Sequence, residues 1–167
     1  MRPSPFRRDP DAAIDVPYKM LISVVLVSMA TAILYPVLQT YQETEMERRL
    51  SLTMAEIESA VVSVHRHPGS SRTLLVDVPS SGGIRLDSIN IGGDLKAPAA
   101  EVGTIEWRLS TGSMGFELVS STTGPVPMAG IDGKGLVIER FPCLIVLEAR
   151  VPPSGGYYKT FVQVSVA

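Results

Sequence analysis

The feature that most constrains this chain is an uncharged apolar segment near its N-terminus, residues 20–38, which reads MLISVVLVSMATAILYPVL. As an α-helix, with a rise of about 1.5 Å per residue, such a segment spans the roughly 30 Å hydrocarbon layer of a bilayer. The remainder of a 167-residue chain is too small to surround this helix with protein on every side. The segment therefore predicts a single transmembrane helix, with the lipid bilayer as its partner.

A cleaved secretory signal is the main alternative to a transmembrane anchor. Ala30-Thr31-Ala32 resembles the small-x-small site that a signal peptidase cuts after a short apolar run. The hydrophobic stretch continues beyond this site through Ile33 to Leu38. Because a cut there would fall in the middle of the apolar run, we favour the anchor and keep the cleaved signal as the alternative.

Charges on either side of the apolar segment predict its orientation. Four basic residues precede it within a short tail: Arg2, Arg7, Arg8 and Lys19. Two basic residues, Arg48 and Arg49, follow it closely. Because positive residues are preferentially retained in the cytoplasm, residues 1–19 are predicted to be a cytoplasmic leader or tail. We expect a single-pass cell membrane protein whose C-terminal domain is extracytoplasmic.

The helical pattern continues beyond the apolar segment and becomes amphipathic. Apolar residues recur three and four apart, at Met46, Leu50, Met54, Ile57, Val61 and Val64. The spacing predicts one helix of about fifty residues, with a transmembrane part at 20–38 and an amphipathic extension at 39–67. Pro36 is expected to kink it. We expect the downstream domain to cover the apolar stripe, and the alternatives are a stalk or a coiled coil with another copy.

Residues 68–167 have the pattern of β-structure. Seven short apolar or alternating runs are separated by turns rich in glycine, proline and serine. The expected strands are residues 73–78, 84–91, 103–109, 115–119, 135–140, 144–151 and 157–166. The chain is therefore predicted to be an α+β protein, in which the long helix precedes an antiparallel β-sandwich or small barrel.

The sequence contains no arrangement of residues typical of catalysis. His65 and His67 are two residues apart, which places them on different helix faces and disfavours a shared metal ion. Cys143 is the only cysteine, so the chain has no internal disulfide, and its apolar neighbours predict a buried side chain. The net charge of −2 argues against nucleic acid as a partner. We expect neither an enzyme nor a bound cofactor or metal.

The order of these parts resembles that of type IV pilin-like proteins, above all the archaeal pilins and the pseudopilins. The resemblance lies in Arg7-Arg8 within a basic leader, small and acidic residues at 11–15, the apolar run, the amphipathic helix and the C-terminal β domain. In that family a prepilin-type peptidase cuts the leader on the cytoplasmic side of the apolar run. The resemblance therefore implies processing near Ala12 and Ala13, and the alternative is an uncleaved signal anchor with a flexible tail.

The same resemblance implies assembly through the N-terminal helix, since mature pilin helices bundle into a filament core. Small residues allow helices to approach closely in lipid. The candidate assembly residues are Asp15, Ser28, Ala30, Thr31, Ala32 and Pro36. In filament-forming relatives an acidic residue near the mature N-terminus pairs with the α-amino group of a neighbouring subunit, and Asp15 is the counterpart here.

The expected function is that of a structural pilin-like subunit, in a surface filament or in the pseudopilus of a secretion or motility machine. Its expected partners are other copies or related pilin-like subunits. The alternative is a membrane-tethered extracytoplasmic domain that binds a ligand or an envelope partner without polymerising.

Overall fold

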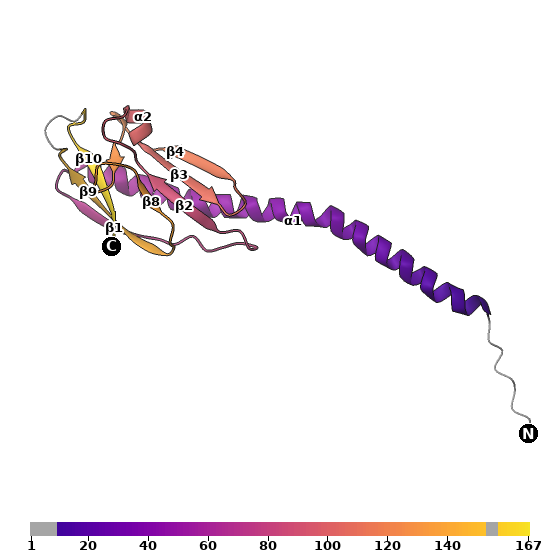
Figure 1. Cartoon of the computed structure of the whole chain (residues 1–167). Helices are drawn as coiled ribbons and strands as arrows, with labels where there is room; N and C mark the ends of the chain where they lie inside the picture. Colours follow the sequence, from indigo (N-terminus) through magenta and orange to yellow (C-terminus); the bar gives the residue numbers. More distant parts are fainter. Residues whose placement is uncertain (1–9, 153–156) are drawn as a thin grey trace, which may run out of the picture. The chain divides into compact units, whose positions relative to one another are not determined.

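The computed structural model of the chain describes residues 10–152 and 157–167, with side chains described from Val16 onward. Helix α1 (Pro10–Arg66) comes first, and the strands follow it (Figure 1). The remaining elements are β1 (Ser71–Val76), β2 (Leu86–Ile91), α2 (Ala99–Val102), β3 (Thr104–Leu109), β4 (Met114–Leu118), β5 (Ser120–Ser121), β6 (Gly124–Pro125), β7 (Met128–Ala129), β8 (Leu136–Ile138), β9 (Cys143–Arg150) and β10 (Phe161–Val166). The predicted α+β class, with a long N-terminal helix before a β-rich part, is confirmed.

Helix α1 runs for 57 residues and passes through Pro17 and Pro36 without interruption. It begins at Pro10, before the apolar segment predicted at residues 20–38, and it ends at Arg66, close to the predicted end at residue 67. Pro68 follows the last turn, and Gly69 adopts the left-handed backbone that commonly terminates helices, with φ of 84°. The amide N–H of Ser70 donates to the carbonyl of His67 and directs the chain into β1.

Within the described residues, the strands form two four-stranded sheets and one two-stranded sheet. The first sheet has the order β1-β9-β10-β7, and the second has the order β4-β3-β2-β8, while β5 pairs with β6. All pairs are antiparallel except β10 with β7, which run parallel. The prediction of a purely antiparallel domain is therefore wrong for this pair. Residues 130–160, which include β8 and β9, supply the long connection that parallel neighbours need.

The predicted strands correspond to β1, β2, β3, β4, β8, β9 and β10, with differences at their ends. Strand β8 covers only Leu136–Ile138, and β10 begins at Phe161, four residues later than expected. The three strands β5, β6 and β7 and the short helix α2 were not predicted. Two-residue strands are too short to show an alternating pattern, because their conformation is set by their neighbours in space.

The apolar stripe of α1 is buried in the centre of the β-rich part. Its six residues from Met46 to Val64 are at most 3% exposed. They belong to one hydrophobic cluster with side chains of both four-stranded sheets, such as Leu147 of β9 and Ile89 of β2. Residues Gln42–Ala167 form one compact unit, so the second part of α1 is an element of the domain. The prediction that the downstream domain covers this stripe is confirmed.

The burial of this stripe predicts a large difference between two substitutions on the same helix. Ile57 is 1% exposed and Leu52 is 62% exposed. Ile57→Asp should destabilise the domain by about 3–5 kcal/mol or prevent folding, because it removes apolar packing and buries a carboxylate without a partner. Leu52→Asp should change stability by about 0.5 kcal/mol or less. Thermal unfolding of the full chain in detergent measures both, and equal losses would contradict the burial of the stripe.

Candidate functional site

The candidate site is the N-terminal part of α1, where the helix presents apolar side chains to its surroundings. Every side chain from Val16 to Tyr41 is exposed. Within this helix an 18-residue window reaches a mean hydropathy of 2.3, and none of that window is buried in the protein. Contiguous apolar surface of this extent marks contact with lipid or with other protein. The helix is long and apolar enough to be a single membrane span.

The serine and threonine hydroxyls in this segment are bonded within the helix. Ser28 Oγ donates to the carbonyl of Val24 at 2.8 Å, and Thr31 Oγ1 donates to that of Val27 at 2.8 Å. Ser23 makes the same bond to Lys19 at 2.9 Å. Because each hydroxyl has an acceptor one turn back, none of these three donors requires water. These three side chains can therefore lie in hydrocarbon without unsatisfied donors.

The helical geometry places some of the candidate assembly residues together and separates another. Ser28, Thr31 and Ala32 are spaced i, i+3 and i+4, so they share one face of α1. Pro36 lies one turn beyond Ala32 and, lacking an N–H, cannot donate to its carbonyl. Ala30 is rotated by about 200° from Ser28 at about 100° per residue, so it projects from the other side. Three small residues therefore share one face of the helix, and Ala30 lies outside it.

The remaining candidates of the N-terminal region are Ala12 and Ala13, named for processing, and Asp15, named for assembly. Their backbone belongs to α1, but their side chains lie outside the described residues. Both assignments remain predictions from the sequence.

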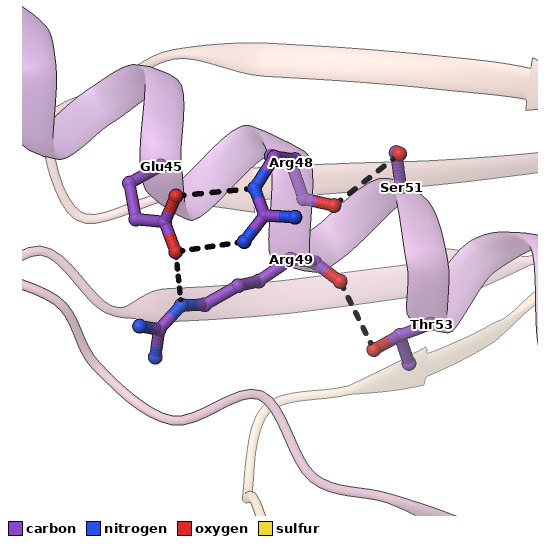
Figure 2. A network of polar contacts seen from close by, with 5 residues as sticks. All are labelled: Glu45, Arg48, Arg49, Ser51 and Thr53. Atoms are coloured by element: carbon purple, nitrogen blue, oxygen red, sulfur yellow. Dashed lines mark hydrogen bonds and ion pairs between the residues drawn. The ribbon is translucent and has the colours of Figure 1, made fainter.

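A charged cluster follows the exposed segment along α1 (Figure 2). Glu45 accepts hydrogen bonds from Arg48 Nε at 3.1 Å and from Arg49 Nε at 2.9 Å. These two bonds lower the pKa of Glu45 to about 2. Ser51 and Thr53 donate to the carbonyls of the two arginines, each at 3.3 Å. This cluster immediately adjoins Met46, the first buried residue of the stripe, so it marks the change from exposed apolar helix to domain core.

The other titratable groups have separate surroundings. His65 Nε2 lies 3.2 Å from Thr160 Oγ1, whereas His67 Nδ1 lies 2.9 Å from the carbonyl of Ser63. Partial burial lowers the pKa of His65, and partial burial raises the pKa of the Cys143 thiol, which keeps it protonated. In the part of the chain that the structure describes, no three metal-ligating side chains lie together. The absence of enzymatic activity stays a prediction.

The sequence reasoning missed one exposed row on the β-rich part. Met114, Phe116 and Leu118 of β4 are 70%, 74% and 41% exposed. In the sequence this row is visible as apolar residues at every second position. Alternation identifies two faces of a strand but does not say which face packs on the core, since that depends on the neighbouring elements.

Comparisons of the chain with protein-family models, with curated proteins and with solved structures found no match. The function must therefore be inferred from α1 and from the compact unit formed by Gln42–Ala167.

The bonds of Glu45 predict a measurable dependence on pH. Because its pKa is lowered from 4.5 to about 2 in the folded protein, its contribution to stability is present above pH 4.5 and is lost as the pH falls toward 2. The Glu45 carboxyl should titrate near pH 2 by nuclear magnetic resonance. Arg48→Gln together with Arg49→Gln should move this midpoint back toward 4.5, and an unchanged midpoint would contradict the assigned bonds.

Proposed function

We propose that the chain is a membrane-anchored structural subunit of the pilin-like kind, which assembles with other subunits through the N-terminal part of α1. The assembly would be a surface filament or the pseudopilus of a secretion or motility machine. One observation carries the proposal: a single uninterrupted helix is exposed from Val16 to Tyr41, is apolar over residues 20–38, and then forms part of the domain core from Met46 onward.

The continuity of α1 favours a subunit over a simple tether. A domain that needs only attachment to a membrane can be joined to its anchor by a non-helical linker. Here the residues between the exposed segment and the first core residue are all helical. The domain depends on the same helix that carries the apolar segment, as expected of a subunit whose helix serves both assembly and folding.

The face formed by Ser28, Thr31 and Ala32 supports helix-to-helix contact. Small side chains let two backbones approach closely in lipid, where dispersion contacts replace the hydrophobic driving force. The hydroxyls of Ser28 and Thr31 are already bonded to their own helix, so this face can pack against another apolar helix.

The finer architecture and the topology belong to the same proposal. Both four-stranded sheets contribute to one hydrophobic cluster with α1, which supports a β-sandwich arrangement for the extracytoplasmic part. The charge bias supports a cytoplasmic position for residues 1–19. A prepilin-type peptidase would cut near Ala12 and Ala13, as in the archaeal pilins that the chain resembles.

The topology predicts the outcome of limited proteolysis on intact cells. A protease added outside should degrade the β-rich part, residues 68–167, because that part lies beyond the membrane. An epitope at the N-terminus should survive until the cells are lysed. Protection of the domain in intact cells would reverse the proposed orientation.

The assembly role predicts that bulk on the small-residue face of α1 blocks polymerisation. The double variant Ser28→Ile with Ala32→Ile should insert and fold normally but yield at least tenfold fewer filaments, because the added side chains keep neighbouring helices apart. Ala30→Ile is the matched control on the other side and should assemble normally. Electron microscopy of cell-surface filaments, with mass spectrometry of their subunit and its mature N-terminus, provides the measurement.

A second variant tests the acidic residue. Asp15→Asn should insert and fold but fail to enter filaments if the Asp15 charge pairs with a neighbouring subunit, since asparagine caps a helix nearly as well as aspartate. Normal assembly of this variant would remove the pairing role. A wild-type protein that is monomeric and uncleaved in membranes would remove the pilin-like function itself.

A non-polymerising binding domain is the second candidate, and one surface feature favours it. An open cleft beside β8 and β9 is lined by exposed apolar side chains, including Leu75, Val137 and Leu144, with Arg140 among the polar ones. Such a cleft could hold an extended apolar ligand with an acidic group. Retention of a ligand by monomeric protein in membranes would favour this function.

A further inference from the structure

A tight turn between β1 and β2 lies against Gln42, the first residue of the compact unit that contains the β-rich part. Gly82 and Gly83 are its central residues, with φ of 58° and 87°. Ser81 and Ile84 exchange two backbone hydrogen bonds across it, at 3.0 and 2.9 Å. A Cβ atom at Gly82 would overlap the side-chain amide of Gln42, so the turn contacts α1 at this residue. Ile84 is buried in the hydrophobic core, which fixes the turn in place.

A second turn, between β3 and β4, is joined to the first one. The amide N–H of Ser110 donates to the carbonyl of Arg85 at 2.9 Å, and the amide N–H of Arg85 donates to Ser110 Oγ at 3.1 Å. The two turns therefore form one surface. We name it the polar tip, and it consists of residues 79–83, Arg85 and residues 110–113.

The polar tip consists of small polar groups. Its two turn segments read PSSGG and STGS, with five hydroxyl-bearing residues and no acidic or large apolar one. Arg85 is its one charged residue, with a side chain that is 75% exposed and an Nε atom 3.4 Å from Asp87 Oδ1. Such a surface has no apolar side chain suited to hydrocarbon, whereas hydroxyl and guanidinium groups can donate to phosphate and ester oxygens.

The position of Gln42 in the sequence limits the distance between the polar tip and the apolar segment. Gln42 follows Leu38, the last residue of the uncharged run, by four residues. In a helix four residues rise by about 6 Å, and even a fully extended chain would span no more than about 14 Å. The headgroup layer on each side of a bilayer is about 5–7 Å thick. A turn that touches Gln42 is therefore within reach of headgroups when the apolar segment lies in hydrocarbon.

Two tyrosines near the end of the apolar segment support the same depth. Tyr35 and Tyr41 are 66% and 69% exposed. Tyrosine is enriched at the boundary between hydrocarbon and water, where its ring and its hydroxyl each find a suitable layer. Tyr41 immediately precedes Gln42 in α1, so a boundary at Tyr41 puts Gln42 and the turn beside it among the headgroups.

We propose that the polar tip rests on the phospholipid headgroups of the membrane that α1 crosses, with Arg85 and the turn hydroxyls bonded to phosphate and ester oxygens. The contact belongs to the single subunit, so it exists before any assembly and on either side of the membrane. It rests on the membrane span of the proposed function. It goes beyond that function by assigning a lipid-binding surface to the folded domain.

The charges near the polar tip favour zwitterionic lipid over anionic lipid. Three acidic residues lie at the start of the compact unit on α1: Glu43, Glu45 and Glu47. Arg48 and Arg49 bond to Glu45. Arg85 lies beside Asp87. This end of the domain therefore has no excess of positive charge to attract an anionic surface, and the contact depends on depth and hydrogen bonding.

Fluorescence quenching of the full chain in phosphatidylcholine vesicles tests the depth of the polar tip. In a Cys143→Ala background, a fluorophore is attached at Ser80→Cys or Thr111→Cys, two exposed positions of the tip. A nitroxide on the lipid headgroup should quench each label at least about threefold more than a label at Ser71→Cys. Ser71 is the matched control, because it is exposed and follows the end of α1, about 36 Å along the helix from Gln42.

A spacer in α1 tests whether the helix sets this depth. Seven polar helix-forming residues inserted between Leu38 and Gln39 add about 10 Å and almost two full turns, so the domain keeps its facing but moves out of the headgroup layer. Headgroup quenching at Ser80→Cys should then fall to the level of Ser71→Cys. The same seven residues inserted before Met20 are the control, because they leave the apolar run and the tip equally far apart.

Two results would overturn the headgroup contact: equal headgroup quenching at Ser80→Cys and Ser71→Cys, or undiminished quenching with the spacer after Leu38. A label at Val27→Cys reports insertion separately. If a nitroxide in the acyl chains did not quench it, both the membrane span and the headgroup contact would be contradicted.

Failure of the assembly role gives a different result. Normal filaments from the double variant Ser28→Ile with Ala32→Ile would contradict assembly through α1, while headgroup quenching at Ser80→Cys in vesicles would stay as expected.

Discussion

The packing of the α1 stripe against both four-stranded sheets is the interaction on which the rest of the domain depends. The sheets are small, and each has one apolar face that must be covered. Residues such as Leu50, Met54 and Ile57 meet side chains from both sheets in one cluster. Without the helix, neither face would be fully removed from water, so the β-rich part cannot be understood apart from the second part of α1.

This dependence gives one helix two different surroundings. From Val16 to Tyr41 its side chains are exposed and largely apolar, and from Met46 one stripe is enclosed by the domain. The ion pairs of Glu45 with Arg48 and Arg49 lie where the exposed apolar part of α1 meets the part enclosed by the domain. The apolar segment extends out of the domain with its side chains exposed. Such a surface suits contact with lipid, with neighbouring helices, or with both in turn.

Two exposed surfaces of the described chain differ in their chemistry. The face of Ser28, Thr31 and Ala32 offers close approach of backbones, whereas β4 offers unpaired backbone groups beside exposed apolar side chains. The first suits helix packing in lipid, where small residues matter most, and the second suits strand pairing in water, where apolar burial adds to hydrogen bonding.

The sequence by itself determined the apolar span, the continuous helix, its buried stripe and the positions of the longer strands. These are periodic signals, and the residues that carry them, such as Leu50 and Ile57, need no knowledge of distant neighbours. Helical spacing alone also separates Ala30 from Ser28. Only the tertiary structure decided that β10 runs parallel to β7, that His65 meets Thr160, and that Phe116 faces outward on an open edge. Each of these depends on residues far apart in the chain, and strand order, partner choice and the exposed face are fixed by packing between elements that local pattern does not encode.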